Sequence, residues 1–124
     1  MDCKDLMVGD LVYIHEPKCK GHRINYISEV DEEVGADGEV YDECDIRPIP
    51  LTEDILVKNG YKSTQGIDFY WLDEKKHCCI KNYDGKRLFC YKQGMNDVWL
   101  VVKYVHTLQH LLRLVGIEKE LIID

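Results

Sequence analysis

Short runs of alternating hydrophobic and polar residues fill the first third of the chain, with turn-forming residues between them. Gly9 and Asp10 precede a β-branched and aromatic run, which predicts a turn that leads into a strand. The predicted order is a strand over 11–14, a loop over 15–21, a strand over 23–30 with imperfect alternation, an acidic turn over 31–38 and a strand over 39–46. This pattern favours a small antiparallel sheet of the SH3-like kind.

A pair of prolines interrupts the pattern after residue 46. Pro48 and Pro50 lack a backbone donor and hold their predecessors extended, so the chain has to turn there. Thr52 follows as a helix N-cap, and acidic residues in the next turn suit the positive end of a helix. With Asn59 and Gly60 as a stop signal, the pattern predicts a two-turn helix over 53–58.

The clearest local signal is Asp84-Gly85 between two alternating segments, the pattern of a two-residue type I′ hairpin. Its register pairs Ile80 with Phe89, Cys79 with Cys90 and Cys78 with Tyr91. We expect Ile80, Cys78, Phe89 and Tyr91 to share the buried face. Further strands over 67–72 and 98–102 complete a predicted β-meander.

Apolar residues recur at helical spacing over 103–115, which predicts one amphipathic helix that ends at Gly116. Its opposite face carries His106, Gln109, His110 and Arg113. We expect this face to be solvated or to meet a partner, and it is our candidate interaction surface. The last segment, 117–124, predicts an edge strand or a frayed end.

The elements together indicate an α+β protein, with an N-terminal antiparallel sheet, a short helix, and a C-terminal β-meander packed by one helix. We expect a single domain over 1–124, with subdomains at 1–50 and 51–124. The start has no signal-like sequence, and the longest apolar stretch, 98–102, is far shorter than a bilayer span. We therefore expect a cytoplasmic protein without a membrane partner.

The formal charge of −7 is unevenly distributed. Residues 29–54 hold eleven acidic side chains against Arg47 alone, whereas residues 75–92 hold six basic side chains against Asp84 alone. A negative total opposes nonspecific binding to nucleic acid, because phosphate contacts need a positive field. The basic segment keeps a nucleic-acid-associated protein as an alternative reading.

Six cysteines suggest no disulfide framework, because the chain has no export signal and is long enough to bury a core. Cys78 and Cys79 should point to opposite faces of a strand, so His77-Cys78-Cys79 does not act as a CxxC pair. A Cys79–Cys90 disulfide is disfavoured in a hydrogen-bonded pair. Cys19 and His22, with Cys3, lack the second half of a zinc site. We expect reduced, mostly buried thiols and no cofactor.

His106 and His110 lie four residues apart, the spacing with which two imidazoles share a zinc ion. The metalloprotease form needs a glutamate after the first histidine, and Thr107 stands there. Catalytic zinc is therefore disfavoured, and a small metal-binding protein stays as the second alternative. The acidic segment lacks the residue order of an EF-hand loop.

Three segments together resemble a group of small uncharacterised bacterial proteins that also occur in phages and mobile elements. They are 5–12 (DLMVGDLV), 46–56 (IRPIPLTEDIL) and 104–109 (YVHTLQ), beside family patterns that read PIPLTEE in the middle and YVHQLQ near the end. The chain departs from this pattern at His110, where the group has asparagine. The resemblance implies no activity and no catalytic residue.

Phosphate loops, dinucleotide fingerprints and nucleophile elbows are absent from the sequence. We therefore expect a noncatalytic protein-binding or accessory module, related to mobile elements by resemblance. Its partner is expected to be another protein, with a homo-oligomer left open, through either the helix face named above or the acidic segment 29–45.

Overall fold

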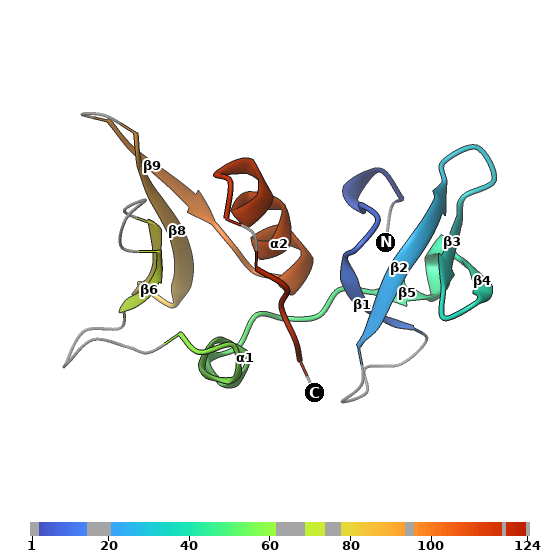
Figure 1. The fold of residues 1–124 in the computed structure, drawn as a ribbon, viewed down its shortest axis with the longest axis horizontal. Coiled ribbons are helices and arrows are strands. Elements are labelled where there is room, and N and C mark those ends of the chain that lie inside the picture. Colours follow the sequence, from blue (N-terminus) through green and yellow to red (C-terminus); the bar gives the residue numbers. More distant parts are fainter. Residues whose placement is uncertain are drawn as a thin grey trace.

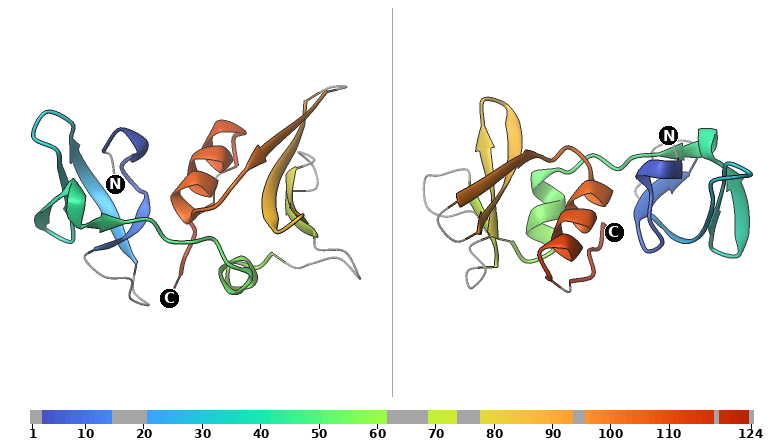
Figure 2. Two further views of the ribbon diagram at one scale, coloured as in Figure 1. Left: turned by 180° about the vertical axis from the view of Figure 1, so that it is seen from behind. Right: turned by 90° about the horizontal axis from the view of Figure 1, so that it is seen from above.

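A computed structural model describes residues 3–14, 21–61, 69–73, 78–93, 96–117 and 119–123 of the chain. Two antiparallel sheets lie at opposite ends of the long axis, and the helices lie between them (Figures 1 and 2). This arrangement confirms the α+β class and the C-terminal β-meander, while the SH3-like character of the first sheet stays a prediction.

The N-terminal sheet has five strands in the order β4-β3-β2-β1-β5. Its elements are the 3-10 turn Cys3–Asp5, β1 (Leu11–Ile14), β2 (His22–Ser28), β3 (Glu33–Ala36), β4 (Glu39–Asp42), the 3-10 turn Glu43–Asp45 and β5 (Ile46–Arg47). The imperfect alternation predicted for the second strand corresponds to a break in register between Ile24 and Tyr26. That break leaves Ile24 buried and Tyr26 exposed.

Two strand predictions in this half are wrong. The predicted acidic turn over 31–38 contains β3, in which Val34 and Ala36 are fully buried, so a short apolar run outweighs the surrounding charges. The predicted strand over 39–46 divides into β4 and β5 around a 3-10 turn. The predicted loop over 15–21 lies outside the described residues except for Gly21.

The first helix, α1 (Glu53–Lys58), confirms the sequence prediction. The Thr52 hydroxyl accepts a hydrogen bond from the Ile55 amide at 3.3 Å, as an N-cap does. Gly60 follows the helix with a φ of +86°, a conformation that favours glycine. Leu56 is the residue that α1 buries in the core.

The C-terminal sheet has the order β6-β7-β8-β9, with β6 (Phe69–Asp73), β7 (Cys78–Tyr83), β8 (Lys86–Gln93) and β9 (Asn96–Val101). The predicted hairpin register is confirmed at all three pairs, including Cys79 opposite Cys90. Asp84 and Gly85 both have positive φ, as a type I′ turn requires. The predicted start of the first strand, residues 67–68, lies outside the described residues.

The second helix, α2 (Val105–Leu114), carries the predicted apolar stripe. Its Val105, Leu108 and Leu112 join a large buried cluster formed with the C-terminal sheet and α1. A second buried cluster lies within the N-terminal sheet and is formed by Leu6, Val12, Ile14, Ile24, Val34, Ala36 and Ile46. The helix therefore packs its apolar side toward one sheet and turns another side toward the other sheet.

The described part of the C-terminal segment forms no strand, and it does not fray either. Leu121 and Ile123 are buried in the larger cluster. The Asn59 side-chain amide donates to the Ile122 carbonyl at 2.7 Å, and its oxygen accepts from the Ile122 amide at 2.8 Å. One side chain at the end of α1 thus replaces the sheet pairing that the sequence suggested.

Candidate functional site

The polar face of α2 is not the solvated surface that its sequence suggested. His106 and Gln109 are only 5% and 6% exposed. His110 and Arg113 are more open, with side chains 28% and 39% exposed. The expectation of a solvated face is therefore wrong for the first two residues, because this face is turned toward the N-terminal sheet.

The side chain of Gln109 joins α2 to the start of β1 through hydrogen bonds to two backbone groups. Its side-chain oxygen accepts from the Leu11 amide at 2.8 Å, and its nitrogen donates to the Gly9 carbonyl at 3.1 Å. Arg23 of β2 donates to the same carbonyl at 2.8 Å. A buried amide side chain that satisfies two backbone groups fixes the position of the helix.

Asp10 is a fully buried carboxylate beside Gln109. It accepts hydrogen bonds from the Met7 amide at 2.8 Å and from Nε2 of His110 at 2.6 Å. Arg113 lies 3.6 Å from the other carboxylate oxygen. The buried charge is thus compensated by groups from α2, as burial of an ion requires.

A cleft of about 700 Å³ lies where α2 begins and the N-terminal sheet ends. Its walls are formed by Lys4, Asp5, Met7, Ile46, Arg47, Pro48, Tyr104, His106, Thr107 and His110. We call this space the α2 cleft. Gln109 and Arg113 instead line a separate cavity of about 600 Å³. The four predicted surface residues are therefore divided between two hollows.

His106 occupies an unusual position in the α2 cleft. Its ring stacks on Tyr104 at 5.7 Å between centroids and meets the His110 ring edge-on at 5.7 Å. Nδ1 of His106 is buried and has no hydrogen-bond partner among the described residues. Burial lowers the pKa of His106 below its ordinary value of 6.5, although the nearby Asp10 carboxylate opposes this shift. The imidazole is therefore neutral at pH 7.

The zinc reading of His106 and His110 finds little support in this geometry. Nε2 of His110 is hydrogen-bonded to Asp10. Among the described residues, no third side chain is placed to ligate a metal ion together with these two imidazoles. His22 is bonded to Asp37, whereas Cys19, His77 and the side chain of Cys3 lie outside the described part.

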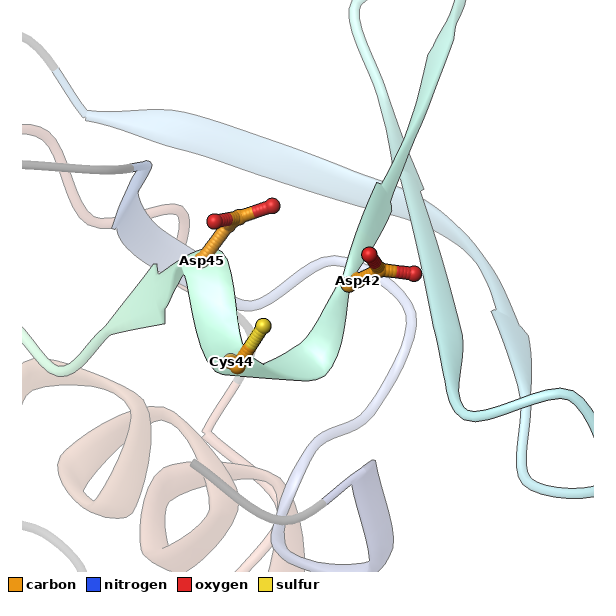
Figure 3. Close-up of side chains that lie close together, drawn as sticks. All are labelled: Asp42, Cys44 and Asp45. Carbon is orange, nitrogen blue, oxygen red and sulfur yellow. The ribbon is translucent and has the colours of Figure 1, made fainter.

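Within the part that the structure describes, three side chains able to ligate a metal ion come together only at Asp42, Cys44 and Asp45 (Figure 3). Their ligand atoms lie within 4.8 Å of one another, at the end of β4 and on the following 3-10 turn. The residues are exposed or half-buried and combine hard oxygens with a soft thiol. This cluster alone indicates no particular ion.

Cys79 and Cys90 lie opposite each other on the outer face of the C-terminal sheet, and both are free thiols. Burial raises the pKa of the Cys90 thiol to about 12 and also raises the pKa of Cys79. Thiols in this state are poor nucleophiles. The pair therefore behaves as buried apolar groups beneath Trp71 and Trp99, which line the same shallow hollow.

A second surface lies along β9, an edge strand that pairs with β8 alone among the described strands. Its consecutive residues Trp99, Leu100 and Val101 are 49%, 42% and 47% exposed. Because neighbouring strand residues point to opposite faces, both faces of this strand end are uncovered. We call this stretch the β9 edge, and no feature of the hydrophobic pattern distinguished it from a buried strand.

Comparison of the chain with protein-family models, with curated proteins and with solved structures gives no match. The resemblance to small bacterial and phage proteins stays a prediction. No helix within the described residues has the length and apolar character needed to cross a lipid bilayer.

Proposed function

We propose that this chain is a noncatalytic protein-binding module, and that its partner adds an extended segment to the β9 edge. The observation that carries this proposal is the exposure of Trp99, Leu100 and Val101 on an edge strand. Apolar surface of this kind commonly marks a site of protein association.

The backbone of β9 supports binding by strand addition. Natural edge strands are usually protected from pairing by lysine, proline or a bulge within the strand. The run 99–101 contains none of these, and its pairing with β8 continues without a register shift to Val101. An added strand would gain main-chain hydrogen bonds, while Trp99 and Val101 would contact alternate side chains.

The charges around the β9 edge favour an acidic partner segment. The Lys81 ammonium lies 5.9 Å from the centre of the Trp99 ring. Lys86 and Lys103 line a shallow hollow with Val101. In a chain with a formal charge of −7, such a local basic rim selects an extended segment with acidic and apolar residues.

Photo-crosslinking from position 99 in an extract of the native cell would identify the partner, and a peptide of its crosslinked segment would then be titrated. We expect Val101→Glu to weaken binding of this peptide at least tenfold, about 1.4 kcal/mol, because it places a negative charge on the edge where an acidic segment would bind. The matched control is Tyr83→Glu, at an exposed position at the end of β7. Binding should also slow exchange of the β9 amides.

Unchanged affinity in Val101→Glu would contradict the proposal. Another contradictory result would be salt-sensitive retention of labelled DNA or RNA that disappears when Lys81, Lys86 and Arg87 are replaced by alanine. That outcome would favour the nucleic-acid reading of the basic hairpin, because phosphate contacts release counterions.

A further inference from the structure

We infer that Cys79 and Cys90 form a dithiol site that binds one Cu(I) ion between their sulfur atoms. The two residues lie opposite each other on neighbouring strands, and both are free thiols with exposures of 6% and 7%. They line a surface hollow of about 220 Å³, through which an ion can reach the sulfur atoms. The site does not depend on the proposed function.

The register of β7 and β8 favours a bridging ion over a disulfide. The two-residue turn after Tyr83 makes Cys79 and Cys90 a hydrogen-bonded pair. The Cβ atoms of such a pair are about 5.5 Å apart, whereas a disulfide needs about 3.8 Å. One ion with two metal–thiolate bonds of about 2.3 Å holds the sulfur atoms up to about 4.6 Å apart. The pair is therefore too wide for a direct S–S bond and suits a sulfur–metal–sulfur bridge.

The two side chains point at each other before any ion binds. The Cys90 thiol donates to the Leu88 carbonyl at 3.7 Å and shares a hydrogen bond with the Cys79 thiol. Burial raises the pKa of both thiols, so they stay protonated without a metal. Binding exchanges two S–H bonds for two S–Cu bonds, releases both protons to solvent and transfers no electron.

The ligand set selects a soft ion that is stable at low coordination. Thiolates favour Cu(I) and Zn(II). Zinc takes four ligands, and no third histidine, cysteine or carboxylate comes together with this pair among the described residues. Cu(I) has a filled d shell and is stable with two sulfur ligands in a nearly linear arrangement. The dithiol site therefore fits Cu(I) better than Zn(II).

A row of four residues across the sheet completes the site. Trp71 lies opposite Cys79 and Trp99 lies opposite Cys90, so each thiol has an indole beside it on the same face. Both indoles line the hollow, where they limit the access of water. Indole faces also attract cations, and the Lys81 ammonium lies 5.9 Å from the centre of the Trp99 ring. The same ammonium compensates the single negative charge of two thiolates and one Cu(I), because it acts electrostatically on both thiols.

The test is an anaerobic titration of the reduced protein with Cu(I), in competition with the coloured chelator bicinchoninate. The chain carries Cys3→Ser, Cys19→Ser and Cys44→Ser, which remove three other thiols. Cys78 stays, because it is buried in the core on the opposite face of β7. We expect one Cu(I) per chain with two sulfur neighbours in X-ray absorption, quenching of tryptophan fluorescence, and no displacement by excess Zn(II).

Variants of this background chain test the location. Cys79→Ser or Cys90→Ser should lower the affinity for Cu(I) at least tenfold, because one remaining sulfur cannot bridge the ion. The matched control restores Cys44, an exposed thiol in the other half of the chain, and should leave the affinity unchanged. The Cβ NMR signals of Cys79 and Cys90 in the background chain give a second readout that requires no change at the site, and both should shift when Cu(I) binds.

The inference is overturned if the background chain loses all its Cu(I) to bicinchoninate, or if Cu(I) binds without shifting the signals of Cys79 and Cys90. It is also overturned if both serine variants bind Cu(I) as the background chain does. Rapid formation of a Cys79–Cys90 disulfide with glutathione disulfide, followed by mass spectrometry, would overturn it as well. That result would show that the two sulfur atoms approach to bonding distance.

Discussion

At the scale of single residues, Gln109 shows how a polar side chain on the outward face of a predicted helix becomes part of the interior. It satisfies one backbone donor and one backbone acceptor of the Gly9–Leu11 turn. Gly9 adopts a φ of +96°, and a Cβ there would lie 2.8 Å from the Arg113 guanidinium. The turn and the helix face are therefore complementary.

Replacing Gln109 with alanine should lower the free energy of unfolding by about 2 kcal/mol, because it leaves the buried Leu11 amide without an acceptor and removes one of the two donors to the Gly9 carbonyl. Chemical denaturation measures this change. The control is Leu114→Ala on the same helix, where the side chain is 80% exposed and the expected change is within about 0.5 kcal/mol. Equal effects in both variants would contradict the role assigned to Gln109.

His106 makes the stability of the protein depend on pH. Its pKa is lowered in the folded state by burial, and the groups that face it are Asp10, His110 and Asp5. The unfolded chain therefore binds a proton at a higher pH than the folded chain does. The contribution of neutral, buried His106 to the free energy of unfolding is fully present above about pH 6.5, and it is lost as the pH falls through the pKa of His106 in the folded state.

Urea denaturation between pH 7.5 and 5 measures this dependence. We expect stability to fall on acidification, and we expect His106→Gln to reduce the slope, because glutamine does not titrate. An identical slope in the variant would contradict this role of His106.

At the scale of elements, the end of α1 holds the C-terminal segment. Asn59 bonds both backbone groups of Ile122, and Lys58 donates to the Ile123 carbonyl at 3.1 Å. The Lys119 ammonium donates a hydrogen bond to the Asn59 carbonyl and lies over the Tyr61 ring. A six-residue helix thus anchors a segment whose described residues form no helix or strand.

Asn59→Ala should release this segment and lower stability by about 2 kcal/mol, because it removes two partly buried hydrogen bonds to the backbone of Ile122. Hydrogen exchange should show loss of protection at the Ile122 amide. Thr52→Ala, which removes the N-cap of the same helix, should destabilise by about 1 kcal/mol and leave the Ile122 amide protected until global unfolding. Retained protection in Asn59→Ala would refute the anchoring role.

At the scale of the whole molecule, α2 joins two buried clusters that otherwise belong to separate sheets. Its apolar side packs into the larger cluster, and its polar side binds the turn before β1. The two sheets should therefore unfold together, although each has its own core.

Both tryptophans, Trp71 and Trp99, lie in the C-terminal sheet, so their fluorescence reports on that half. Methyl NMR signals of Ile24 and Val34 report on the N-terminal half. We expect coincident denaturation midpoints in the parent protein. In Gln109→Ala the N-terminal signals should be lost at lower denaturant, and separate midpoints already in the parent would contradict coupling through α2.

Local patterns in the sequence were sufficient for the elements whose cause is local. Thr52 caps α1, and Asp84-Gly85 sets both the turn and the register of β7 and β8. In each case the decisive interaction lies within a few residues of the chain. β3 escaped prediction because its four residues lie in an acidic background, and its stability depends on pairing with β2 and β4.

The sequence alone determined the α+β class, the hairpin and the two helices, because hydrophobic periodicity and turn chemistry act over short distances. Only the tertiary structure decided that the polar face of α2 is buried against Gly9 and Asp10, about a hundred residues away in sequence. A pattern of polar residues is the same whether water or distant backbone satisfies them. The tertiary fold decides whether water or distant backbone groups are the hydrogen-bond partners of these side chains. The same fold places His106 in the α2 cleft and leaves the β9 edge uncovered.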